Sequence, residues 1–383
     1  MIIMQILGLK KVAGKGGDTL KVSPPFSRSI ILLLFLLVVS SCDDSSSPTL
    51  PTIEEESPEP MPTTDSPIAQ EGTIAFYNVE NLFDTEDDPS NPRDNEFLPN
   101  AEKEWTAERY AHKLDNIGKV MEGVNFPIIM GLAEVENQQV LEDLLEIEAL
   151  ANHAYQIVHK ESPDFRGIDV ALLYQADHFT LTDWETYTIQ IDDPIINNFT
   201  TRDILRVSGE LFNSPIHIFV NHWPSRSGGA TATEFRRITV ANELSTIVKD
   251  LQATLPEANI LLMGDFNDEP TNKSILEVLA AQPLEEERDQ GQLYNCTTPL
   301  DRLGEGSFNF QGDWQMIDQI MATGNLLNTQ NTWSLQNFQV YSDPTLLFTH
   351  PEYGLSPDRT YGGDVYFGGF SDHLPIFMEI IVQ

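Results

Sequence analysis

The chain has 383 residues, of which 40% are apolar and 9% aromatic, which is enough to bury the core of a full globular domain. It carries 22 basic and 59 acidic residues, a formal charge of −37 at pH 7. Broad negative charge repels polyanions at long range, which excludes nucleic-acid binding through an extended basic surface.

The first 41 residues are typical of an export signal. Five basic residues precede the ten apolar residues 30–39, and a pair of serines then precedes Cys42. Ten apolar residues are too few to span a bilayer, which takes about 20. The stretch Val39-Ser40-Ser41-Cys42 resembles a bacterial lipobox, so we expect residues 1–41 to be removed and Cys42 to carry lipid. An ordinary cleaved signal with an incidental cysteine is the alternative.

Residues 42–71 predict an extended tether, because they are rich in acidic residues, proline and serine and have no apolar periodicity. Without residues 1–41 the chain keeps 17 basic and 58 acidic residues, a formal charge of −41. A chain of this charge attracts cations, which is consistent with a metal-dependent enzyme. The only other cysteine is Cys296, so no disulfide framework is expected.

The globular region is predicted to span residues 72–383. Helices are predicted at 107–122, with Thr106 as the capping residue, and at 138–151, 233–252 and 272–280. Residues 360–369 are glycine-rich with interleaved aromatic residues and are expected to form a plain connection, with a mobile loop flanking the site as the alternative. Strands are predicted from apolar runs and alternation at 72–77, 127–133, 155–159, 169–174, 179–191, 205–211, 216–221, 260–263, 307–310, 315–321, 338–341 and 374–382.

Polar residues gather where these predicted strands end. Each has a structural explanation on its own, as a turn residue, a helix cap or a solvated charge. Glu134 and Asp318 weaken that explanation, because each follows or interrupts an apolar run where an unpartnered carboxylate is costly to bury. Loops on a rigid sheet scaffold commonly carry catalytic groups, so the endings together predict one active site. They are Asn78 and Glu80; Glu134; Asp169; Asn221 and His222; Asp265 and Asn267; Asp318; and residues 371–373.

These endings belong to six ordered motifs that resemble the endonuclease/exonuclease/phosphatase superfamily over residues 72–383. Residues 166–172 and 221–226 are most similar to the bacterial extracellular nuclease branch. The resemblance implies an α/β fold, a four-layer sandwich of two packed mixed β-sheets flanked by helices, with the site at one rim. The motifs are Phe76-Tyr77-Asn78-Val79-Glu80-Asn81, Gly131-Leu132-Ala133-Glu134-Val135-Glu136-Asn137, Asn221-His222-Trp223-Pro224-Ser225-Arg226, Gly264-Asp265-Phe266-Asn267-Asp268, Ile317-Asp318 and Ser371-Asp372-His373-Leu374-Pro375.

The resemblance implies a metal-dependent phosphoesterase. Glu134 would hold Mg²⁺, with Mn²⁺ or Ca²⁺ as alternatives, and Asn78 would lie beside it. Asp372 would be a further metal contact. Asp265 would orient or deprotonate the attacking water, and Asn267 would donate to the phosphate.

Two histidines complete the implied site. His373 would be held by Asp318, which fixes the tautomer and raises the basicity of the imidazole. His222 would protonate the leaving oxygen, with Asp169 as its orienting partner. The other histidines match no motif and are expected to be structural. Two arginines are candidate phosphate contacts, with a surface ion pair as the alternative for each: Arg202 and Arg226.

Three functions stay open at this point. The first is an exported, lipid-anchored, monomeric nuclease of the bacterial cell envelope, which the stretches 166–172 and 221–226 favour. The second is a phosphatase or phospholipase acting on phosphoinositides, sphingomyelin or small phosphoesters, which the acidic charge favours. The third is a non-catalytic surface binding protein. Such a protein should lack one of four residues, all of which are present: Glu134, Asp265, Asn267 and His373.

Overall fold

The computed structural model describes residues 69–89, 91, 93–284 and 287–382. The predicted signal, Cys42 and residues 42–68 of the predicted tether lie outside the described residues. Residues 69–71 of that tether instead begin the first strand, β1 (Ala69–Leu82). Within the described part of the chain, no helix has both the length and the apolar character needed to cross a membrane.

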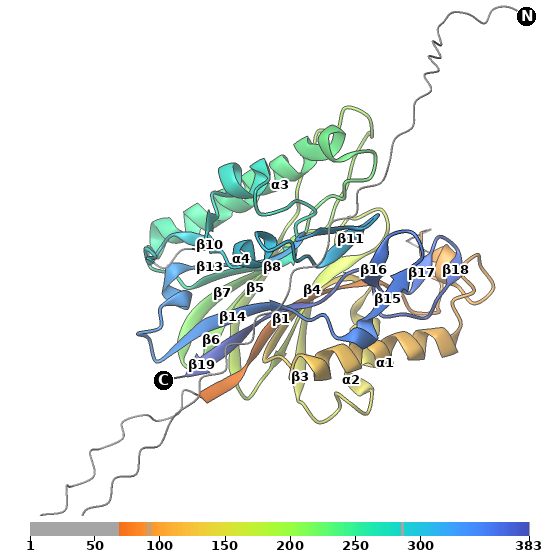
Figure 1. Ribbon diagram of the computed structural model, residues 1–383, viewed down its shortest axis with the longest axis horizontal. Coiled ribbons are helices and arrows are strands. Elements are labelled where there is room, and N and C mark those ends of the chain that lie inside the picture. The colour runs from red at the N-terminus through yellow and green to blue at the C-terminus, as the bar shows by residue number, and fades with distance from the viewer. Residues whose placement is uncertain (1–68, 90, 92, 285–286, 383) are drawn as a thin grey trace, which may run out of the picture. The chain divides into compact units, whose positions relative to one another are not determined.

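Two large mixed sheets form the centre of the fold (Figure 1). The six-stranded sheet has the order β14 (Trp333–Val340), β19 (Ile376–Val382), β1, β2 (Ile129–Val135), β4 (Asp169–Gln175) and β3 (Tyr155–His159). The seven-stranded sheet has the order β5 (Phe179–Tyr187), β6 (Ile204–Leu211), β7 (Ser214–His222), β8 (Ile260–Asp265), β13 (Asp318–Thr323), β10 (Leu293–Asn295) and β9 (Gln282–Pro283).

The alternation of side chains along β1 explains how the layers form. Ile74 and Phe76 point into the core between the two sheets, whereas Ala75 and Tyr77 point to the opposite face. That outer face packs on α1 (Ala107–Gly123) and α2 (Gln138–Glu146). The expected cap is present, because the Thr106 side chain accepts a hydrogen bond from the backbone N–H of Arg109.

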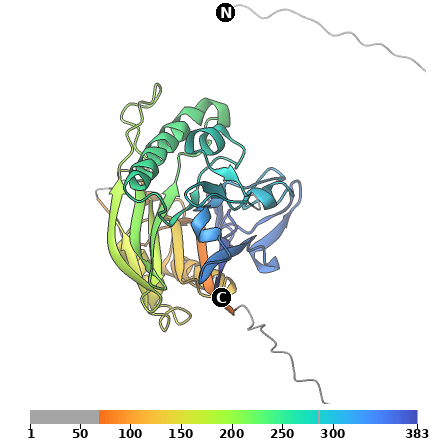
Figure 2. The ribbon, with the colours of Figure 1, turned by 90° about the vertical axis from the view of Figure 1, so that its left-hand side faces the viewer.

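On the other side, α3 (Ala230–Thr254) and the π-helix η2 (Ser274–Leu279) cover the outer face of the seven-stranded sheet. Figure 2 shows α3 in green along the outside of the strands. The order of layers is therefore helix, sheet, sheet, helix, which confirms the predicted four-layer α/β sandwich. Gly131 of β2 lets the sheets approach, since a Cβ there would lie 2.6 Å from the Sδ of Met263 on β8.

Three small hairpins extend from the sandwich at one end (Figure 1). They are β11–β12 (Phe308–Phe310 and Asp313–Gln315), β15–β16 (Leu347–His350 and Gly354–Pro357) and β17–β18 (Tyr361–Gly362 and Val365–Tyr366). The single strand predicted over 315–321 is thus divided between β12 and β13. The plain connection predicted over 360–369 is wrong, because Gly363 at φ +63 turns the chain into a hairpin. The remaining short helices are η1 (Asp94–Phe97), α4 (Thr298–Asp301), η3 (Gly324–Leu327) and η4 (Pro344–Leu346).

Candidate active site

Strands from both sheets end at one rim and place polar side chains there. β7 and β8 are parallel, and His222 pairs in register with Asp265. Asp265 in turn lies opposite Asp318 of the antiparallel strand β13. These endings border a cavity of about 640 Å³. Its lining includes Glu134, Arg166, His222, Arg226, Asp265, Asn267, Asp372 and His373.

His373 and Asp318 form the predicted pair. The imidazole Nδ1 lies 2.6 Å from Asp318 Oδ2, and the Ser307 hydroxyl donates to the same oxygen at 2.6 Å. Burial lowers the pKa of His373, but the charge and hydrogen bond of Asp318 outweigh it and hold this pKa well above its usual value. The other nitrogen, Nε2, faces the cavity side and lies 3.9 Å from Asp265 Oδ2.

Asp265 lies at the centre of the site. The Asn78 side-chain amide donates to its Oδ2 at 3.1 Å, and the Asn267 backbone N–H donates to its Oδ1 at 2.9 Å. Burial, followed by the negative charge of Asp318, raises the pKa of Asp265 to about 7. A carboxyl group with such a pKa can exchange a proton near neutral pH, as a general base requires.

Glu134 adopts an unusual backbone conformation at the bulge where β2 ends. Its φ is +66°, a region that few non-glycine residues adopt. Its carboxylate accepts from the Asn81 backbone N–H at 3.1 Å and from Arg166 Nη2 at 3.2 Å. Burial raises the pKa of Glu134, but neighbouring cations, chiefly Arg166, bring it below its usual value. The carboxylate therefore stays ionised in the cavity.

The donor set fits a divalent cation that prefers oxygen. His222 Nε2 lies 3.8 Å from Glu134 Oε1 and 3.6 Å from Asp265 Oδ2, so both carboxylates converge on one part of the cavity. Mg²⁺ binds through few carboxylates and keeps several waters. The Asn78 Oδ1 accepts from the Glu80 backbone N–H at 3.1 Å and retains a second lone pair.

Asp372 lines the same cavity, but its nearest cationic partner is Arg359. Arg359 Nη2 donates to Asp372 Oδ2 at 2.9 Å. The other carboxylate oxygen, Oδ1, lies 4.0 Å from His373 Nε2. A metal contact by Asp372 therefore stays a prediction, and the structure gives this residue an arginine partner instead.

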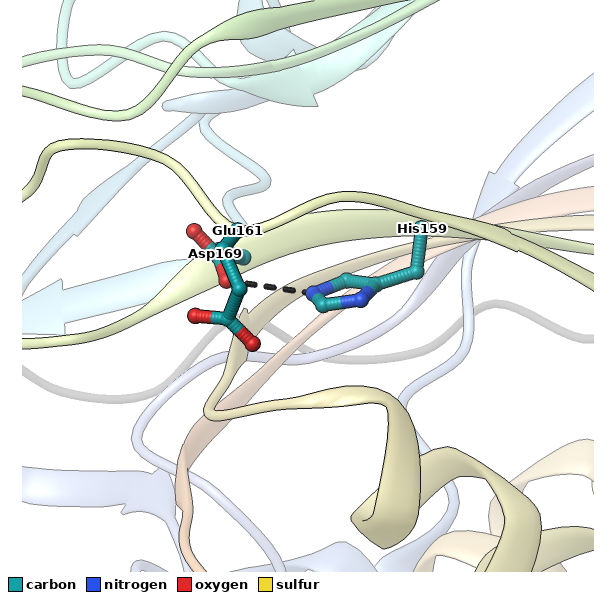
Figure 3. Close-up of side chains that lie close together, drawn as sticks. All are labelled: His159, Glu161 and Asp169. Carbon is teal, nitrogen blue, oxygen red and sulfur yellow. Dashed lines mark hydrogen bonds and ion pairs between the residues drawn. The ribbon is translucent and has the colours of Figure 1, made fainter. Parts of the chain in front are cut away.

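The predicted pairing of Asp169 with His222 is wrong. Asp169 Oδ2 lies 3.1 Å from His159 Nε2 (Figure 3), and Ser162 N–H donates to Asp169 Oδ1 at 2.8 Å. The reason is strand placement. Asp169 is on β4, beside β3 with its His159, whereas His222 ends β7 in the other sheet. His159 is thus the structural partner of Asp169.

His222 has a different environment from the one predicted. Its Nδ1 is buried and has no hydrogen-bond partner among the described residues. Burial, and then the positive charges of Arg202 and Arg166, lower its pKa well below the usual value. His222 is therefore a neutral imidazole beside a protonated one, His373.

The two predicted phosphate arginines both support backbone. Arg202 is buried and donates to the His222 carbonyl at 3.1 Å and to Asp164 at 2.9 Å, so it does not line the cavity. Arg226 lines the cavity, and its Nε donates to the Asn267 carbonyl at 2.6 Å. Asn267 also donates through Nδ2 to the Trp223 carbonyl at 3.0 Å. These contacts fix the loops that carry His222 and Asn267.

Three residues of the site were not assigned from the sequence. Arg166 lines the cavity with a side chain that is 35% exposed to solvent, and the nuclease-like stretch 166–172 was the signal that pointed to it. Ser307 and Phe308 carried no such signal. Both reach the site because Phe308 forms a β-bridge with His373. The rings of Phe308 and His373 lie with their centroids 4.9 Å apart.

Comparison with known proteins places the fold. A family model described as the Endonuclease/Exonuclease/phosphatase family matches residues 73–382. A family protein of this kind from Bacteroides thetaiotaomicron has a similar structure, with 17% identity, a TM-score of 0.50 and coverage of 82% of this chain and 98% of that one. A comparison with curated protein sequences gave no significant match.

Two further solved structures match at similar levels. Mannosyl-6-phosphatase Bt3783 of Bacteroides thetaiotaomicron shares 18% identity, with a TM-score of 0.49 and coverage of 81% of this chain and 99% of that one. The human Nocturnin catalytic domain shares 15%, with a TM-score of 0.47 and coverage of 83% and 97%. At these identities the likeness concerns the fold alone.

Proposed function

Because this chain belongs to the endonuclease/exonuclease/phosphatase family, whose members are hydrolytic phosphoesterases, we propose that it is a divalent-metal-dependent phosphodiesterase that cleaves nucleic acid. The observation that carries the proposal is the convergence of Asp265, Glu134 and His373 on one cavity beside the half-buried Arg166. These groups supply a base, a cation ligand, a proton donor and a positive charge, which phosphodiester hydrolysis requires.

The proton transfers fall to Asp265 and His373. Asp265, with its pKa near 7, accepts the proton of the attacking water. His373 is kept protonated by Asp318 and gives its Nε2 proton to the leaving oxygen. This assignment replaces the proton-donor role predicted for His222, because its low pKa leaves the imidazole neutral near pH 7 with no imidazolium proton to give to the leaving oxygen. His222 instead donates a hydrogen bond to a phosphoryl oxygen.

Other residues of the cavity would stabilise the negative charge on the phosphoryl oxygens. Glu134, with Asn78 beside it, would hold the cation, which supplies Lewis-acid charge to the phosphoryl oxygen when bound. Arg166 is tethered by Glu134 at 3.2 Å and keeps further N–H donors for the phosphate. Asn267 adds a second donor from the loop that follows β8.

The enzyme is proposed to act outside the cytoplasm as a lipid-anchored monomer. The support is the export signal and the lipobox-like stretch that ends at Cys42. In cells, Cys42→Ala should shift the protein from the membrane fraction to the soluble or secreted fraction. A variant that stays in the membrane fraction would contradict the anchor.

One observation favours a second candidate function. The formal charge of −41 without residues 1–41 opposes the approach of a long polyanion, which favours a phosphatase or phospholipase acting on small phosphoesters, phosphoinositides or sphingomyelin. The same catalytic groups would serve that reaction. The substrate would differ from nucleic acid only in the groups that are attached to the phosphate.

The test uses residues 42–383, with Mg²⁺ or with EDTA, against plasmid DNA, RNA, a phosphoinositide and sphingomyelin in parallel. Metal-dependent loss of supercoiled plasmid or of RNA is expected. Asp265→Asn should abolish it, whereas Asp183→Asn, a matched change of an exposed carboxylate on β5, should not. Turnover of only a lipid or small phosphoester would establish the second candidate, and activity retained in Asp265→Asn would contradict the mechanism.

A further inference from the structure

A second cavity of about 730 Å³ adjoins the active site. The two cavities share three lining residues, Phe308, Phe310 and Asp372, so the second continues the first. Its walls come from the hairpins β11–β12 and β15–β16 and from the segment that holds β17–β18. Figure 1 shows these hairpins together at one end of the sandwich.

Aromatic rings dominate this second cavity, which we name the aromatic cleft. Phe310 is 56% exposed and Phe367 is 59% exposed, values that are unusual for large apolar side chains gathered in one place. His350 and Tyr353 stack on each other, with ring centroids 4.6 Å apart and planes 10° apart. The lining rings are Phe308, Phe310, Phe348, His350, Tyr353 and Phe367.

These rings are not needed to hold the sandwich together. None of them belongs to the buried clusters that fill the layers of the described part of the chain. Phe308 alone touches a catalytic group, since it lies against His373. The two most exposed rings, Phe310 and Phe367, therefore remain available to a ligand that extends from the cleaved phosphate.

The chemistry of the cleft favours a nucleobase. Asp358 and Arg359 line the cleft together with the rings, and Arg359 is already paired with Asp372. A hydrocarbon chain would remove the Asp358 carboxylate from water without giving it a partner. A nucleobase offers flat faces for the rings and polar edges for the charged groups. Stacking does not depend on net charge, so it supplies affinity for nucleic acid that a chain of charge −41 lacks electrostatically.

We propose that the aromatic cleft stacks an unpaired base adjacent to the cleaved phosphate, so that the substrate is single-stranded nucleic acid. The inference rests on the nuclease function proposed above. In a duplex the bases are already stacked and paired, and one of them would have to leave the helix to enter the cleft. The cleft thus distinguishes single strands from duplexes.

The first test compares kcat/KM for an end-labelled single strand and for the same sequence as a duplex, with residues 42–383 and Mg²⁺. The wild type should prefer the single strand. The double variant Phe310→Ala/Phe367→Ala should lose about 5- to 150-fold on the single strand, the range expected for one stacked base, and far less on the duplex. Trp184→Ala, a 40% exposed aromatic on β5 that lines neither cavity, is the matched control and should lose nothing.

The second test removes the base instead of the rings. An abasic sugar next to the cleaved phosphate should slow the wild type by a similar factor and should not slow the double variant further. Equal slowing in both proteins, or none in either, would overturn the inference. Circular dichroism checks that the variants fold. If the wild type cleaves the single strand and the double variant is equally fast, the stacking inference alone fails. If the wild type cleaves neither nucleic acid, both proposals fail.

Discussion

Asp318→Asn tests the central pair of the site. Asp318 Oδ2 accepts from His373 Nδ1 and from the Ser307 hydroxyl, each at 2.6 Å. The substitution keeps the volume but removes the charge that holds the pKa of His373 above its usual value. A hydrogen bond to a charged group contributes about 1.5–3 kcal/mol. Loss of a positioned proton donor costs about 10²- to 10⁴-fold in kcat. We expect a fall of that size with KM little changed.

Stability should change with pH in a defined direction. Because the folded pKa of His373 is raised, its contribution is fully present below the unfolded value of 6.5 and is lost as pH rises through the folded pKa. In urea titrations the variant should be less stable than the wild type by about 1.5–3 kcal/mol at pH 6. That difference should narrow in alkaline solution.

Ser307→Ala is the matched control for this substitution. It removes a neutral donor from the same oxygen and leaves the negative charge in place. Its cost should be about 0.5–1.5 kcal/mol, with less than a tenfold loss in kcat, and the His373 imidazole should keep its raised pKa in an NMR titration. If Asp318→Asn turns over at the wild-type rate, or if both variants lose the same activity, the charge argument is refuted.

Four further predictions concern the walls of the cavity and the buried charged groups of the fold. Arg166→Met should chiefly lower kcat/KM, by about 10²-fold. Arg202→Met, which leaves buried carbonyls and a carboxylate without their donor, should instead lower the free energy of unfolding by about 3–5 kcal/mol in urea. EDTA should abolish turnover reversibly, and Mg²⁺ should raise the Tm of the wild type but not of Glu134→Gln, as measured by calorimetry. Lys113 is buried, and burial lowers its pKa to about 8. Its folded state therefore releases the proton before the unfolded state does, so the stability of the wild type relative to Lys113→Met should rise between about pH 8 and 10.5.

Much of the fold followed from local patterns. The strand at residues 155–159 and the helix that begins at residue 107 lie where they were predicted, because period-2 and period-3.6 patterns and a capping residue are local signals. The pairing of His373 with Asp318 was also predictable. A carboxylate within an apolar run needs a partner, and the motif resemblance supplied one.

Other features depend on how separate strands come together. The wrong pairing of Asp169 with His222 arose because the sequence does not say that β3 pairs with β4, which places His159 beside Asp169. The sequence also does not show where a guanidinium group points. Arg202, for example, donates to a backbone carbonyl and does not line the cavity. The aromatic cleft was missed because its hairpins are too short for periodicity to reveal them. The pattern around Phe310 therefore predicted only an ordinary strand residue.

The groups proposed for catalysis come from both sheets, so their separation depends on the distance between the sheets. Glu134 follows Gly131 on β2, and Asp265 follows Met263 on β8, in the region where only a hydrogen atom at position 131 fits against the Met263 sulfur. A methyl group at that buried position would lie 2.6 Å from the Met263 Sδ, so we expect Gly131→Ala to displace that side chain or to move β2 away from β8. A change in the spacing of the two sheets at this point would change the distance between Asp265 and Glu134. We therefore expect turnover to depend on buried packing as well as on the residues that line the cavity.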